Sequence, residues 1–80
     1  MKAKIHITLK NGVLDPQGKA IENALDHLGF SGINQVRQGK YIELALDETS
    51  HDKASAQLKE MCEKLLANTV VENYQFELVD

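Results

Sequence analysis

The chain has 80 residues and a formal net charge of −3, with 42% hydrophobic and 26% charged residues. This length holds one domain, residues 1–80, and the composition excludes a wholly disordered chain. The negative charge disfavours a nucleic-acid binder or a protein held on anionic lipid, and no apolar run is long enough to span a bilayer.

A single cysteine, Cys62, cannot form an internal disulfide, whereas small secreted domains usually carry several cysteine pairs. The first ten residues, MKAKIHITLK, alternate between apolar and polar and do not read as a signal peptide. We therefore expect a cytoplasmic protein. Because short chains often gain stability by associating, we also expect it to form oligomers.

The first half of the chain predicts a strand followed by a helix. Apolar Ile5, Ile7 and Leu9 alternate with polar residues, which is typical of a half-buried strand. Asp15-Pro16 then reads as a helix start, with Asp as the N-cap and Pro at the first helical position. The helix has an apolar stripe and is expected to end at a left-handed Gly29. The stripe residues are Ala20, Ile21, Ala24, Leu25 and Leu28.

The second half predicts two further strands, a helix and a last strand. Residues 33–38 read as a strand with two strong apolar positions, and Gln38-Gly39 permits a tight turn into the strand of Ile42, Leu44 and Leu46. Thr49 and Asp52 suggest a helix cap. A second helix follows, which Asn68 can end, and then a last strand with alternating apolar residues. The apolar stripe of the helix is Ala54, Leu58, Met61, Leu65 and Leu66, and the apolar positions of the strand are Tyr74, Phe76 and Leu78.

The predicted order β-α-β-β-α-β favours a ferredoxin-like α+β sandwich. Its two helices would bury their stripes on one face of a four-stranded, mainly antiparallel sheet. The other face is mixed and can be solvated or can meet a second copy. Its residues are Lys4, His6, Thr8, Tyr41, Glu43 and Ala45.

Catalytic and metal-binding patterns are weak in this sequence. Residues 12–19 suggest a phosphate loop, but the glycine spacing is too long and Ala20 stands where Ser or Thr is needed. The three histidines fall on different elements without metal-ligand spacing. Cys62 lies beside an apolar stripe and has no evident base, so it reads as a small core residue.

Other ferredoxin-like functions lack their own motifs here. The chain has no aromatic pattern for RNA recognition, no Cys-x-x-Cys loop for copper transfer, and no Arg in the first loop for a phosphatase-like enzyme, because Arg37 is its only arginine. A ligand-sensing regulatory module stays open, since such modules have poorly defined loop motifs.

Three segments together resemble the PurS family. They are residues 9–21 (LKNGVLDPQGKAI), residues 36–44 (VRQGKYIEL), and residues 61–68 (MCEKLLAN) with 71–74 (VENY). The resemblance runs along nearly the whole chain. Thr69 departs from it, because the family commonly has Pro at this position. The loss of Pro weakens the signal that ends the helix but leaves Asn68 as a terminator.

The resemblance implies a non-catalytic small subunit of phosphoribosylformylglycinamidine synthase in purine biosynthesis. It implies a homodimer or tetramer that joins a glutaminase subunit to a large synthase subunit and supports ammonia transfer. ATP and magnesium would bind the synthase partner, and this chain would carry no catalytic, cofactor or metal site.

We expect the first loop and the predicted hairpin to face partners. Apolar Val13 and Leu14 in a loop either staple the helix or meet another protein. The full set of interface candidates is Gly12, Val13, Leu14, Asp15, Gly18, Gln38, Gly39 and Lys40.

Overall fold

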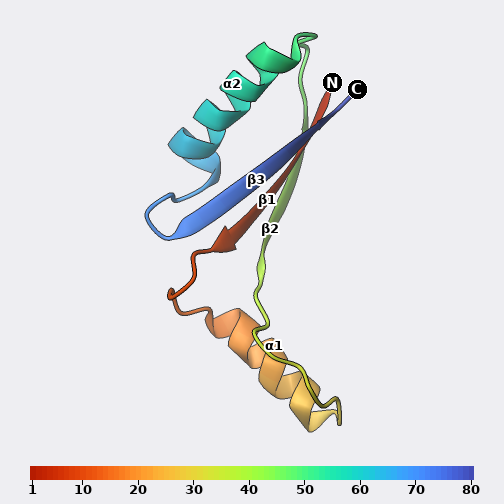
Figure 1. Ribbon diagram of the computed structural model, residues 1–80, viewed down its shortest axis with the longest axis vertical. Coiled ribbons are helices and arrows are strands. Elements are labelled where there is room, and N and C mark those ends of the chain that lie inside the picture. The colour runs from red at the N-terminus through yellow and green to blue at the C-terminus, as the bar shows by residue number, and fades with distance from the viewer.

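The computed structural model describes residues 1–80 as an α+β fold with a three-stranded antiparallel sheet (Figure 1). The elements are β1 (Lys2–Leu9), α1 (Pro16–His27), β2 (Gly39–Ala45), α2 (His51–Met61), the π-helical turn η1 (Cys62–Leu66) and β3 (Glu72–Val79). The strand order in the sheet is β2-β1-β3. No helix has the length and apolar character needed to cross a membrane.

The central strand β1 carries the core of the sheet. Ala3, Ile5 and Ile7 are fully buried, while the residues between them point to the opposite face. Ile5 lies opposite Ile42 of β2 and Phe76 of β3, so apolar residues of all three strands share one face. This confirms the strand predictions made from alternation, including the mixed polar character of the other face.

Helix α2 and the start of η1 cover this apolar face, with Ala54 and Leu58 of α2 and Cys62 of η1 all fully buried. Its N-cap is Ser50, whose Oγ accepts a hydrogen bond from Lys53 N–H at 3.3 Å, so the predicted cap at Thr49 is one residue early. Burial of a leucine such as Leu58 contributes about 1.5–3 kcal/mol to folding.

The predicted stripe of α2 is wrong at Leu65, whereas Met61 and Leu66 pack against the core as expected. After Met61 the backbone widens into η1, where Ala67 N–H donates to Cys62 C=O, five residues back. This π-helical turn rotates the chain, so Leu65 is 82% exposed while Ala67 is buried. A regular 3.6-residue period cannot anticipate the insertion.

Helix α1 forms as predicted, but it does not pack on the sheet. It leaves the end of β1 and projects from the sheet, and the chain returns alongside it to β2 (Figure 1). Residues 10–38, which we call the arm, make the molecule 48 × 26 × 15 Å, with a radius of gyration of 15.9 Å. A compact chain of 80 residues would have a radius of gyration of roughly 12 Å. The expectation of two helices on one sheet face is therefore wrong for the single chain.

The fourth strand predicted over residues 33–38 is also absent from this sheet. Gly32 and Gln35 have positive φ angles of 79° and 56°, which interrupt an extended strand. The backbone N–H of Val36 donates to the Glu22 carboxylate, and that of Gln38 donates to the Asp15 carboxylate. Neither donates to a neighbouring strand. Because residues 33–38 run alongside α1 and not alongside β2 (Figure 1), β2 is left as an edge strand of the sheet.

We predict that Leu58→Ala lowers the free energy of unfolding by about 2–5 kcal/mol, because it leaves a cavity under α2. The matched variant Leu65→Ala should change it by less than about 0.5 kcal/mol, since that side chain is exposed. Urea denaturation at one fixed protein concentration measures both. Equal losses would contradict the π-helical register of η1.

Candidate functional site

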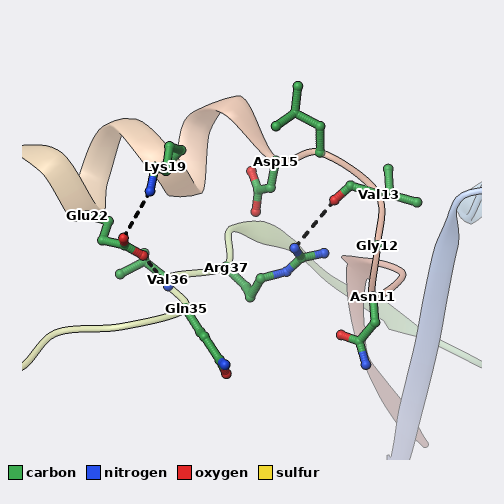
Figure 2. A pocket seen from close by; sticks show the side chains of 10 residues that line it. Asn11, Gly12, Val13, Asp15, Lys19, Glu22, Gln35, Val36 and Arg37 are labelled. Carbon is green, nitrogen blue, oxygen red and sulfur yellow. Dashed lines mark hydrogen bonds and ion pairs between the residues drawn. The ribbon is translucent and has the colours of Figure 1, made fainter.

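The residues predicted to face partners gather at the base of the arm. There the loop after β1, residues 10–15, meets the end of the returning segment, residues 35–38 (Figure 2). The two segments border an open hollow of about 640 Å³ together with Lys19 and Glu22 of α1. We call this base the hinge, because the chain passes between sheet and arm twice at this place.

Asp15 connects the two chain segments of the hinge. Its Oδ1 accepts a hydrogen bond from Gly18 N–H and its Oδ2 accepts one from Gln38 N–H, both at 2.9 Å. The hydrogen bonds from Gln38 and Gly18, with the nearby Arg37 charge, lower the pKa of the Asp15 carboxyl. The predicted N-cap role is confirmed, and with 8% exposure the side chain lies inside the hinge.

Two glycines allow the close approach of these segments. A Cβ on Gly18 would collide with Val36 C=O and lie 2.7 Å from Asp15 Oδ2. A Cβ on Gly39 would collide with Ile7 C=O, where β2 begins beside β1. Both predicted residues therefore pack against backbone, Gly18 within the arm and Gly39 at the start of the β1–β2 pair, and neither has a side chain to offer a partner.

Arg37 binds the other side of the hinge, a role that the sequence reasoning missed. Its Nη2 donates to Leu9 C=O at 2.8 Å and to Lys10 C=O at 3.0 Å. Its Nη1 donates to Val13 C=O at 3.5 Å, the bond drawn in Figure 2. The guanidinium thus caps the last carbonyl of β1 and the start of the loop. The sequence held one signal for this role: Arg37 is the only arginine of the chain, and it directly precedes Gln38-Gly39.

The charges around the hollow are mostly paired with one another. Glu22 accepts from Val36 N–H and from Lys19 Nζ, each at 3.3 Å, and these bonds lower the pKa of its carboxyl (Figure 2). Because Asp15 already occupies the start of α1 and Arg37 binds carbonyls, little positive charge is free for an anion. The geometry therefore supports rejection of the phosphate-loop interpretation.

The remaining candidates lie on the outside of the hinge. Leu14 is 78% exposed, Val13 is half-buried, and Gly12 forms an open turn with a φ of 86°. Lys40 Nζ lies 3.6 Å from Glu72 Oε2, an ion pair between strands on either side of β1. Leu14 is thus the one large apolar side chain among the candidates that the fold leaves uncovered.

Catalytic chemistry finds little support elsewhere in the chain. Cys62 is fully buried, and burial raises the pKa of its thiol, which disfavours the reactive thiolate. No group of three or more His, Cys, Asp or Glu residues is arranged to hold a metal ion. On the polar sheet face, Tyr41 Oη donates to Glu43 Oε1 at 2.8 Å, and the ring centroids of Tyr41 and His6 lie 4.8 Å apart in an edge-to-face contact.

The fold and the hinge define a small α+β domain with a projecting arm. The family model described as PurS, phosphoribosylformylglycinamidine (FGAM) synthase, matches residues 2–80. The chain is 53% identical to the PurS subunit of Synechocystis over 94% of its length and 75% of that protein, and 47% identical to the Bacillus subtilis subunit over 96% and 90%. The chain belongs to the PurS family.

Solved structures agree with this assignment. The B. subtilis PurS crystal structure superposes with a TM-score of 0.86 at 47% identity, covering 99% of this chain and 98% of that one. A chain of the structure described as PurLQS from Thermotoga maritima superposes with a TM-score of 0.88 at 33% identity, covering 98% and 95%. The similarity to these structures therefore extends over nearly the whole chain, including the residues of the arm.

The hinge predicts a pH dependence of stability. The pKa of Asp15 is lowered on folding, so its hydrogen bonds stabilise the fold above the carboxyl's ordinary pKa of 3.8 and are lost as the pH falls through the lower, folded value. Asp15→Asn should remove this part of the acid dependence in thermal melts between pH 6 and about 2. Asp26→Asn, on the exposed side of α1, should retain it. Identical acid profiles for Asp15→Asn and wild type would contradict the assignment.

Proposed function

We propose that this chain acts as the small, non-catalytic subunit of a phosphoribosylformylglycinamidine synthase, an ATP-dependent ligase of purine biosynthesis. The observation that carries the proposal is the superposition of nearly the whole chain on a chain of the PurLQS structure. The relatives of this chain are themselves described as subunits of that synthase. As part of such a complex the chain would work in the cytoplasm, which fits its single unpaired cysteine.

The chemistry would lie on the partner subunits. A glutaminase subunit would release ammonia from glutamine, and a large synthase subunit would bind ATP and magnesium and convert formylglycinamide ribonucleotide to the amidine. The buried Cys62 and the internally paired charges of the hinge support this division of roles. This chain would bridge the two subunits and support the transfer of ammonia between them.

We further propose that two copies form a homodimer through their arms. The arm exposes apolar residues that a folded chain normally buries, with Leu28 at 74% and Phe30 at 57% exposure. On the sheet, α2 leaves the apolar face of β2 only half-covered at Ile42 and Leu44. The helix that would cover this face in a ferredoxin-like sandwich is α1, so the arm of a second copy supplies the missing layer.

The outer surface of the hinge is the proposed contact for the other subunits. Leu14 is the best candidate for direct contact because it is an exposed large apolar residue on the hollow of the hinge. Gly12 and Val13 border the same hollow as Leu14, and Lys40 lies at the start of β2 just beyond the hinge. Asp15, Gly18 and Gly39 hold the shape of that surface from inside.

A reconstitution assay tests the subunit role. Glutaminase and synthase subunits are mixed with formylglycinamide ribonucleotide, ATP and either glutamine or ammonia, and ADP release is followed with and without this chain. We expect glutamine-driven turnover to require the chain and ammonia-driven turnover to require it much less. Equal glutamine-driven rates with and without it would contradict the proposal and favour a ligand-sensing module.

A charge introduced at Leu14 tests the contact surface. Leu14→Asp should weaken capture by the synthase subunit about tenfold or more, because it places an unpaired charge in an apolar contact. Thr49→Asp adds the same charge on an exposed residue of the β2–α2 connection, at the opposite end of the sheet, and should leave capture unchanged (Figure 1). Unchanged capture by Leu14→Asp, together with a lowered melting temperature, would show that Leu14 staples the arm.

A further inference from the structure

The hinge is bridged in two independent ways, one beside β2 and one beside β1. Asp15, at the start of α1, accepts the N–H of Gln38, the residue immediately before β2. Arg37, in the returning segment, donates to the carbonyl of Leu9, the last residue of β1. The first bridge fixes the start of α1 against the residue that leads directly into β2, and the second connects the arm to the end of β1.

These bridges oppose rotation of the arm toward its own sheet. For α1 to lie over β2 of the same chain, residues 10–15 and 38–39 would have to adopt new backbone angles. That change would break the hydrogen bond of the buried Asp15 to Gln38, or the arginine bonds to the Leu9 and Lys10 carbonyls. A carboxylate without its donors in this site carries the cost of desolvation without compensation.

The glycines give each side of the hinge close backbone packing. Gly18 lies against Val36 C=O within the arm, and Gly39 lies against Ile7 C=O within the sheet. Close-packed backbone deforms little. The arm and the sheet therefore meet as two stiff parts, and the bonds of Asp15 and Arg37 set the angle between them.

We propose that Asp15 and Arg37 form a latch that holds the arm extended, so that α1 is unavailable to its own sheet and is presented to a second copy. This inference rests on the proposed arm-mediated homodimer and adds the residues that position the arm. The latch favours association by pre-organising each chain in its binding-competent shape. Asp15 and Arg37 are positioning residues, because they act through the direction of the arm and not by contact with the partner copy.

The size of the effect follows from the number of arms involved. An apparent dissociation constant rises as the competent fraction of each partner falls. If an unlatched arm is extended about one tenth of the time, and each dimer needs two extended arms, the dissociation constant rises about a hundredfold.

Sedimentation velocity over a wide concentration series tests the latch on the full chain. The variants are Asp15→Asn, which loses one of its two acceptor oxygens, and Arg37→Ala, which removes the donors to Leu9 and Lys10. The matched control is Glu22→Gln, because the bond from Val36 N–H to Glu22 joins α1 to the returning segment without involving a residue that borders a strand. Both latch variants should raise the dissociation constant by ten- to a hundredfold, while the control stays within about twofold of wild type.

The outcomes separate the latch from the dimer itself. A monomeric wild type at all concentrations would refute the proposed homodimer. A dimeric wild type with unchanged dissociation constants in both latch variants would overturn the latch alone, and so would an equal weakening by Glu22→Gln. Arg37 is exposed and outside the cap of α1, so Arg37→Ala decides the question if circular dichroism shows that Asp15→Asn does not fold.

Discussion

The carboxylate of Asp15 joins the first turn of α1 to the residue before β2, and the shape of the molecule depends on this connection. One oxygen caps the helix and the other holds the returning segment, so the direction of α1 is coupled to the direction of β2. Arg37 reinforces this coupling from the β1 side. With the hinge arranged in this way, α1 points out from the sheet.

An extended arm leaves one chain with two incomplete apolar surfaces. The stripe of α1 has no sheet beneath it, and the β2 side of the sheet has only part of a helical cover. Because both surfaces belong to the same chain, two copies can satisfy both by exchanging arms. This geometry gives a physical reason for a domain of this size to work inside an assembly, as proposed for this subunit.

Local patterns predicted the elements well, because each depends on neighbours in sequence. The alternation of Ile5 and Ile7, the Asp15 cap and the left-handed Gly29 all appear as expected, with a φ of 96° at Gly29. The π-helical turn was not predictable from a regular period, and it exposes Leu65. The direction of the arm depends on Asp15 and Arg37 contacts with residues far along the chain, and no local pattern encodes them.

Function was predictable by resemblance and not by chemistry. The chain offers no reactive cluster, so residue-by-residue reasoning reached only a small α+β domain, and the PurS segments carried the assignment further. Among the candidate interface residues, the exposed and buried members could not be told apart by sequence. Leu14 and Asp15 are adjacent, yet one is open to solvent and the other lies inside the hinge.

The most direct measurement of the central claim is an isotope-filtered NOE experiment on chains refolded together from methyl-labelled and unlabelled protein. It detects methyl contacts between chains separately from contacts within one chain. The account predicts contacts between chains that join Ile21 or Leu28 of the arm to Ile42 or Leu44 of the sheet. If these contacts occur only within a single chain, the arm folds back onto its own sheet and the account is wrong.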